Sequence, residues 1–392
     1  MDIPSEVFAR FESVEKKINK TKQEILEGKP SAETAERRLM HSQREMVKKA
    51  AEDAADAGAR AARAATQERV IGTNDILLLG FFCAGLIASR AVGRINVAGG
   101  LERATGFLVS PELVMTNQHV LPDRNHAASA EIDFEDFDVL GNHRHTHSCR
   151  LDPARFFFAD PDLDVAVVAI EDDERCRAVT GELGWHPMIG GEGKILVGDP
   201  VNIIQYPGGI HKSIVVHNSN LLHLQNGGPL DTYCWYSTDT KKGSSGSPVF
   251  NNRWEVIGVH HRSIPKRNKE GGYVDVAGKK MTREEYLKDP ERAVYVANEG
   301  SRTSRIVRAL TAATFDDSAQ VEIRDSLLNL WEGSKAVNQG QLSARDAARQ
   351  GDQAATARGP ETESLRQDVI SHATPGLPGA INIHLHFGNG RG

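Results

Sequence analysis

The first 68 residues carry the hydrophobic pattern of two helices. In the first, large apolar side chains recur mostly every three or four positions and so share one face. These side chains are Val7, Phe8, Phe11, Val14, Ile18 and Ile25. The pattern breaks at residues 28–30, after which Ser31 is a candidate N-cap for a second, alanine-rich helix. We expect a helical hairpin that lies on the rest of the chain or on a second copy, or that recruits a partner.

Between about residues 90 and 300 the pattern changes to short strands. Brief apolar runs alternate with turns rich in Gly and Pro, and helix signals are few, which is typical of an all-β barrel architecture. The strand candidates are residues 90–97, 107–109, 113–121, 131–134, 155–158, 162–170, 194–198, 201–209, 212–216, 221–224, 233–238, 254–262 and 293–296. An apolar run at 76–88 precedes them. It is too short to span a bilayer, and we expect it to be buried against the first strands.

The remaining stretches are helical or polar. Residues 263–291 are charged and predict a surface loop with a short helix around 282–287. Two amphipathic helices are expected at 304–310 and 321–331. Residues 335–375 predict a flexible tail. The alternating residues 381–387 predict an edge strand, which would pair with its own sheet or another copy, or else bind a partner or cover a cleft.

Charge and cysteine content exclude several classes of function. The formal net charge of −6 argues against a general nucleic-acid binder. The four cysteines lack the short paired spacing of zinc sites and redox motifs. One or two disulfides fit the spacing, but free thiols are the favoured interpretation. The N-terminus has no signal-peptide pattern, so we expect a cytoplasmic protein that does not engage a membrane.

Alternating histidines at residues 143–147 raise the question of a metal site. No third ligand accompanies them, and so we expect an exposed loop and no bound metal or other cofactor.

The chemistry is concentrated around Ser245, which lies between Gly243 and Gly246. A serine hydroxyl becomes a nucleophile only with a base in reach and an acid that orients the base. His119 ends a predicted hairpin, and Asp164 directly precedes an apolar strand, whereas Asp162 follows a proline and suits a turn. We expect His119, Asp164 and Ser245 to form a triad, with the N–H groups of Gly243 and Ser245 as the oxyanion hole. The G-x-S-x-G elbow of α/β-hydrolases does not fit, because its last glycine is replaced by serine.

Three motifs in this order resemble a trypsin-like serine peptidase. They are Thr-Asn-x-His-Val at 116–120, Asp-Val-Ala-Val-Val at 164–168 and Gly-Ser-Ser-Gly-Ser-Pro-Val-Phe at 243–250. The similarity is greatest to the bacterial branch related to V8 glutamyl endopeptidase. It implies a two-barrel domain over residues 69–312, with barrel 1 at about 90–185 and barrel 2 at about 193–300.

The resemblance also indicates where the side chain before the cleaved bond (P1) would bind. Thr240 and His260 occupy the positions that bind an acidic P1 side chain in glutamyl endopeptidases. Asp239 lies about where trypsins carry the acid that binds a basic one. If Asp239 instead points away, it would pair with Lys241 or Arg262. Acidic, basic and other P1 preferences therefore stay open, with acidic favoured.

We therefore predict a mainly β, two-barrel serine endopeptidase acting on polypeptides. A helical extension (1–68) precedes it, and a helix, polar linker and strand (313–392) follow. The extensions or a protein partner would regulate its activity. The helical extension and the C-terminal strand would bind that partner or a second copy of the chain. The alternative is a dormant protease fold that binds partners through its extensions.

Overall fold

The computed structural model describes residues 5–27, 33, 35–55, 79–137, 143–225, 227–228, 230–268 and 270–337. The chain divides into two compact units, residues 1–341 and 342–392, and the described residues all belong to the first. The predicted edge strand at 381–387 and all but the first three residues of the predicted tail (335–375) lie outside the described residues. Residues 335–337 are not tail but the end of a helix, Ser318–Val337.

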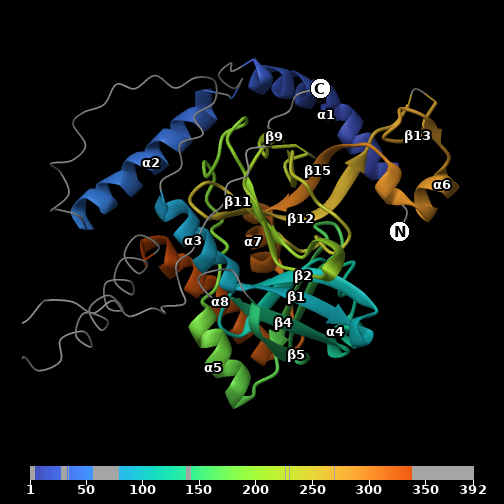
Figure 1. Cartoon of the computed structure of the whole chain (residues 1–392). Coiled ribbons are helices and arrows are strands. Elements are labelled where there is room, and N and C mark those ends of the chain that lie inside the picture. The colour runs from blue at the N-terminus through green and yellow to red at the C-terminus, as the bar shows by residue number, and fades with distance from the viewer. Residues whose placement is uncertain are drawn as a thin grey trace, which may run out of the picture. The chain divides into compact units, whose positions relative to one another are not determined.

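The first half of the β region is a closed antiparallel barrel (Figure 1). Its strands follow each other in the order β1-β2-β3-β6-β5-β4. Their bounds are β1 Val92–Val97, β2 Glu102–Leu108, β3 Leu113–Thr116, β4 Ala130–Phe137, β5 His143–Asp160 and β6 Val165–Ile170. Strand β6 is buried along its whole length, which explains its uninterrupted apolar sequence. The predicted strands of this region are confirmed, except that β3 ends at Thr116 and residues 117–121 of the predicted strand 113–121 are not strand. The loop expected at 143–147 is instead the start of β5, although His143 and His145 are exposed as expected.

The second half is a seven-stranded antiparallel sheet in the order β8-β7-β11-β12-β15-β10-β9. Its strands are β7 Asn202–Gln205, β8 Ser213–Val215, β9 Leu221–Leu224, β10 Tyr233–Tyr236, β11 Pro248–Phe250, β12 Val256–Pro265 and β15 Tyr295–Arg302. A small hairpin, β13 Tyr273–Val274 with β14 Lys280–Met281, completes the strands. No strand forms at 194–198 as predicted. There the Asp199 N–H donates to the Leu196 carbonyl at 3.1 Å, and this turn bends the chain before a ladder can form.

The two predicted N-terminal helices are present as α1 Ser5–Leu26 and α2 Ala35–Ala55. The apolar stripe of α1 is buried and packs on the second sheet. Val7, Phe11, Val14 and Ile18 form one cluster with residues of β9, β10, β12 and β15. Helix α1 is therefore part of the hydrophobic core of this unit.

The other helices are α3 Leu79–Arg90, α4 Arg124–Ala128, α5 Glu174–Leu183, α6 Arg283–Lys288, α7 Thr303–Ala312 and α8 Ser318–Val337, with 3₁₀ turns at Ala98–Gly100, Pro207–Gly209 and Pro290–Arg292. Most of them cover the barrel and its junction with the sheet, whereas α6 packs with Phe8 of α1 and the β13–β14 hairpin. The short helix at 282–287 and the two predicted C-terminal helices are confirmed as α6, α7 and α8. The burial predicted for 76–88 is wrong for α3, because Leu79 and Leu86 are exposed. Among the described helices, none has the length and apolar character needed to cross a membrane.

One core cluster joins the barrel to the sheet. Phe107 and Met115 of the barrel lie in it with Tyr206 and Phe250 of the sheet region. Helices α7 and α8 extend the cluster, and the indole of Trp331 donates to the Val109 carbonyl at 2.7 Å. The junction of the two β units is thus fixed by shared packing, so side chains from both can be held in register there.

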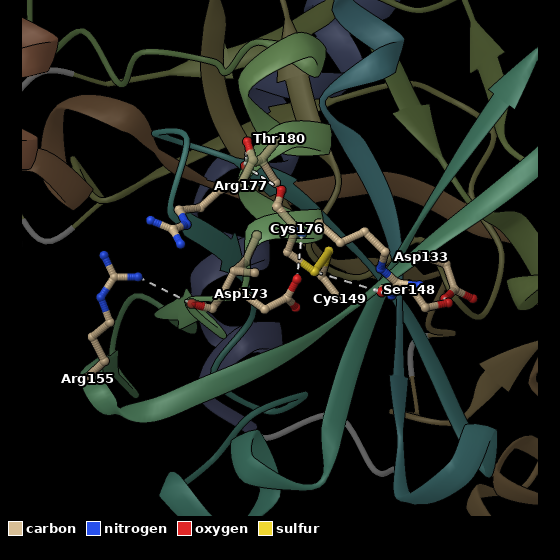
Figure 2. Close-up of a disulfide and its surroundings, with 10 residues drawn as sticks. Asp133, Ser148, Cys149, Arg155, Asp173, Cys176, Arg177 and Thr180 are labelled. Atoms are coloured by element: carbon tan, nitrogen blue, oxygen red, sulfur yellow. Dashed lines mark hydrogen bonds between the residues drawn. A yellow bond between two sulfur atoms is a disulfide. The ribbon is translucent and has the colours of Figure 1, made fainter.

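Cys149 of β5 and Cys176 of α5 form a disulfide, with Cα atoms 5.9 Å apart (Figure 2). The expectation of free thiols is wrong for this pair, while Cys83 and Cys234 are free. Helix α5 was not predicted, and its N-cap Asp173 accepts the Cys176 N–H at 2.9 Å. Disulfides persist mainly in oxidising compartments, so this bond counts against the cytoplasmic location expected from the sequence.

Candidate active site

His119 and Asp164 meet at one edge of the barrel. Strands β3 and β6 pair antiparallel with Thr116 opposite Ala166, so the residues after β3 lie beside those before β6. The Nδ1 atom of His119 lies 2.8 Å and 3.0 Å from the two carboxylate oxygens of Asp164. The backbone N–H of His119 also donates to Asp164, at 2.9 Å. Asp162, the rejected alternative, makes no such contact in the described part of the chain.

The loop that carries Asp164 is held at three successive carbonyls. The Tyr233 hydroxyl donates to the Asp162 carbonyl at 2.6 Å, and the Ser301 hydroxyl donates to the Leu163 carbonyl. The Asn117 side-chain amide donates to the carbonyl of Asp164 itself, at 2.8 Å. Asp164 adopts a left-handed φ of 51°, which costs energy for a residue with a side chain. These three anchors hold that conformation and aim the carboxylate at His119.

Ser245 lies where the sheet meets the barrel. Its carbonyl accepts the Thr105 N–H at 2.8 Å, and the next N–H, of Gly246, donates to the His260 carbonyl at 2.9 Å. Gly246 has φ 84°, and a Cβ there would collide with the Thr105 carbonyl and the Thr116 hydroxyl. Only glycine fits this approach. Since Thr116 is three residues before His119, the turn holds Ser245 beside the chain that carries the histidine.

Two N–H groups of this turn have no partner. Within the described residues, neither Gly243 nor Ser245 donates its backbone N–H to a hydrogen bond, although Ser244 between them donates to the Lys241 carbonyl. The carbonyl of Gly243 is engaged, by the Thr105 hydroxyl at 2.8 Å. Two unpaired donors that flank one residue are what an oxyanion hole requires.

The Ser245 hydroxyl is half-buried and has no hydrogen-bond partner in the described part of the chain, His119 included. Such contacts are often long in the absence of substrate and tighten when it binds.

Further charged groups, which the sequence did not indicate, surround Asp164. His261 lies on β12 at a bulge, where the register shifts between His260 and Arg262. Its Nδ1 is 3.2 Å from Asp164, and its Nε2 is 3.1 Å from the buried Glu299. Burial alone would raise the pKa of Asp164, but hydrogen bonds from His119 and His261 outweigh it and hold that pKa well below its usual range. Asp164 is therefore ionised.

The residues expected to bind the P1 side chain are divided between two environments. Asp239 and Thr240 line a cavity of about 500 Å³ together with Ser263, Asn298 and, from α1, Lys22. The Thr240 hydroxyl lies 2.8 Å from that of Ser263 and 2.9 Å from Asn298 Oδ1.

His260 does not line this cavity. It is buried, and its Nδ1 pairs with the Tyr236 hydroxyl at 2.8 Å. Burial lowers its pKa to about 3, so the ring is neutral. Within the described residues, no hydrogen bond joins Thr240 to His260. Asp239 is exposed and, among the described residues, forms no ion pair with Lys241 or Arg262.

Within the described residues, no group of three or more His, Cys, Asp or Glu side chains is arranged to hold a metal ion.

The region around His119, Asp164 and Ser245 is similar to known peptidases. Residues 104–259 match the family model described as a trypsin-like peptidase domain. The protein y4fB of Sinorhizobium fredii, itself uncharacterized, is 33% identical over 254 residues, which are 61% of this chain and 38% of that protein. A glutamyl endopeptidase of Staphylococcus aureus is 23% identical over 172 residues, covering 44% of this chain and 50% of that protein. This chain thus spans between 38% and 50% of the length of these two relatives.

Two solved structures superpose loosely on this chain. The HtrA-type protease AlgW, solved with a tripeptide, gives a TM-score of 0.38 at 15% identity, over 59% of this chain and 62% of that one. The inactive form of Rv3671c from M. tuberculosis gives 0.37 at 16% identity, over 58% and 88%. The residues matched by the family model run from Ala104 to Val259 and include the histidine, the aspartate and the serine of the three motifs. The chain therefore contains a trypsin-like peptidase domain.

Proposed function

We propose that this protein is a serine endopeptidase that cleaves polypeptides through His119, Asp164 and Ser245. The observation that carries the proposal is the pairing of His119 Nδ1 with a buried, ionised Asp164 carboxylate. The two unpaired N–H groups of Gly243 and Ser245 support it independently.

The reaction follows from these positions. The Ser245 hydroxyl attacks the peptide carbonyl carbon, and its proton passes to Nε2 of His119. The Asp164 carboxylate accepts the Nδ1–H of the ring and stabilises the imidazolium that forms. The negative carbonyl oxygen is bound by the N–H groups of Gly243 and Ser245. His119 then returns the proton to the departing amine, and water hydrolyses the acyl-enzyme by the same steps. No cofactor takes part.

We further propose that the P1 side chain is acidic. Lys22 also lines the cavity that Thr240 lines, and its ammonium group donates to the Val296 carbonyl. A hydroxyl and a cation suit a carboxylate, because charge-assisted hydrogen bonds offset its desolvation. The neutral His260 contributes at most an N–H donor. Asp239, which would favour a basic side chain, is exposed at the same cavity and leaves that competing preference open to test.

The experiment is hydrolysis of an internally quenched peptide library by the full chain, beside Ser245→Ala and His119→Ala. We expect turnover by the wild type, cleavage after Glu or Asp, and loss of turnover in both variants. Cleavage that survives Ser245→Ala would reject the assignment of the nucleophile.

The second candidate is a dormant protease fold that binds partners through its extensions. The observation in its favour is the missing hydrogen bond between Ser245 and His119 in the described structure. A folded wild type that leaves every peptide intact would support it. The first proposal predicts the opposite result.

A further inference from the structure

A continuous series of ion-paired groups runs from the N-terminal helix to the candidate active site. The guanidinium of Arg10 on α1 lies 2.6 Å and 3.2 Å from the two carboxylate oxygens of Glu299 on β15. Glu299 lies 3.1 Å from Nε2 of His261, and Nδ1 of the same ring lies 3.2 Å from Asp164. Asp164 in turn holds His119. Arg10 thus reaches the base of the proposed triad through three intervening side chains.

These contacts are buried, so water does not screen them. The side chain of Glu299 is fully inaccessible, that of His261 is 2% exposed and that of Arg10 is 17% exposed. Tyr233 lies between Arg10 and His261. The guanidinium carbon is 4.0 Å from the centre of its ring, and the imidazole of His261 stacks on it at 5.6 Å with an interplanar angle of 3°. The hydroxyl of the same tyrosine anchors the Asp162 carbonyl in the loop that carries Asp164.

The charges alternate along the series. Burial alone would lower the pKa of His261, but its hydrogen bonds to Asp164 and Glu299 raise it above its ordinary value. Burial alone would raise the pKa of Glu299, but His261 and Arg10 lower it. His261 is therefore an imidazolium that donates one N–H to each carboxylate. The other titratable groups that face the series are His260, Arg262, Tyr236, Cys234 and Glu6.

We propose that Arg10, Glu299 and His261 are positioning residues for the reaction, through which the docked helix α1 holds Asp164 in the orientation that His119 requires. This inference rests on the proposed function, since Asp164 matters only if His119 acts as a base. It makes α1 an activating element of the site. The buried carboxylate of Glu299 needs both partners, because an ionised group without a counter-charge in the interior is costly.

The first experiment compares two full-length variants that each remove one cation from α1. Arg10→Met breaks the contact to Glu299. Lys20→Met is the matched control, because the Lys20 side chain is 69% exposed and pairs only with Glu24 among the described residues. We expect Arg10→Met to lower kcat on the order of tenfold at nearly unchanged KM, by analogy with the roughly 10–100-fold loss when a hydrogen-bond partner of a metal-binding histidine is removed. Lys20→Met should match the wild type, and Arg10→Lys should recover most of the loss.

The pH dependence of kcat/KM separates this role from a structural one. Removing the positive charge of Arg10 favours the protonated form of nearby imidazoles and so raises the pKa of His119. The acid limb of the kcat/KM profile should therefore move to higher pH. Glu299→Gln removes a negative charge from the same buried series and should move the limb to lower pH. General loosening of the fold cannot produce opposite shifts. If Arg10→Met fails to fold, as judged by circular dichroism, Glu299→Gln and its direction of shift carry the test.

A measurement that needs no turnover keeps this inference separate from the proposed function. The imidazole N–H protons of His119 and His261 should give low-field NMR resonances in the wild type. We expect them to broaden or vanish in Arg10→Met and to persist in Lys20→Met. If the wild type shows no Ser245-dependent turnover, the proposed function fails. The resonances alone then decide whether Arg10 holds His261 and His119 in place. Retention of the resonances in Arg10→Met, or equal kcat and pH profiles for the two α1 variants, would overturn the inference.

Discussion

Gly243 offers the sharpest test of the oxyanion hole, because its backbone can be perturbed without touching a triad side chain. Its φ of 95° lies in the left-handed region that favours glycine. A Cβ placed there would lie 2.5 Å from the Tyr206 carbonyl oxygen and 2.7 Å from the Gly209 nitrogen. Both atoms are backbone, so neither can rotate away. Gly243→Ala must therefore shift the turn and with it the Gly243 N–H.

The magnitude follows from two contributions. Loss of one oxyanion donor costs about 3–4 kcal/mol of transition-state stabilisation, or roughly 10²–10³ in kcat. A left-handed alanine adds a strain of about 1–2 kcal/mol to the folded state. The control is Gly278→Ala, where φ is 77° and nothing lies within 4 Å of the added Cβ. It carries the same kind of backbone strain without the collision and far from the proposed chemistry.

The assay is steady-state hydrolysis of the preferred peptide, with urea unfolding of each variant. Gly278→Ala should lose about 1–2 kcal/mol of stability and keep kcat. Gly243→Ala should lose at least as much stability and also about 10²–10³ in kcat, with a smaller change in KM. Equal kcat values in two folded variants would refute the role given to the Gly243 N–H.

Three further predictions concern specificity and stability. Lys22→Met should reduce the preference for Glu over Gln at P1 in competing peptides, and an unchanged ratio would remove Lys22 from the subsite. Burial lowers the pKa of His186 to about 4, so the folded state favours the neutral ring. The free energy of unfolding, measured by urea titration, should therefore be highest above the ordinary pKa of about 6.5. It should fall by up to about 3 kcal/mol as the pH drops toward 4. His186→Gln should flatten that slope. Replacing both Cys149 and Cys176 by Ser should cost about 2–4 kcal/mol of unfolding free energy. A reductant that destabilises this double variant as much as the wild type would contradict the disulfide's role.

The sequence predicted the parts of the structure that depend on local pattern. The strand that follows Asp164 and the hairpin before His119 are short-range features, and antiparallel pairing of β3 with β6 then brings the two side chains together. The turn around Ser245 carries its own glycines. These elements needed no knowledge of distant contacts.

The parts that escaped prediction depend on neighbours remote in the chain. His261 faces Asp164 because a bulge in β12 turns it, and its other partner Glu299 comes from a strand 38 residues later. Arg10 is 289 residues from Glu299, and no periodicity in α1 singles it out. The disulfide could not be predicted because Cys176 lies on α5, and this helix was not predicted within a region that reads mainly as strands. Residues 194–198 have strand composition, but the turn closed by the Asp199 N–H and the Leu196 carbonyl prevents an extended strand there.

The most direct test of the central claim is labelling of the full chain with a fluorophosphonate probe, followed by peptide mapping. A serine reacts only when its base and oxyanion donors are assembled, so the account predicts one modified residue, Ser245. Labelling should be lost in Ser245→Ala and in His119→Ala while both variants stay folded. A folded wild type that remains unlabelled, or that is labelled at a different serine, would contradict the proposed catalytic site.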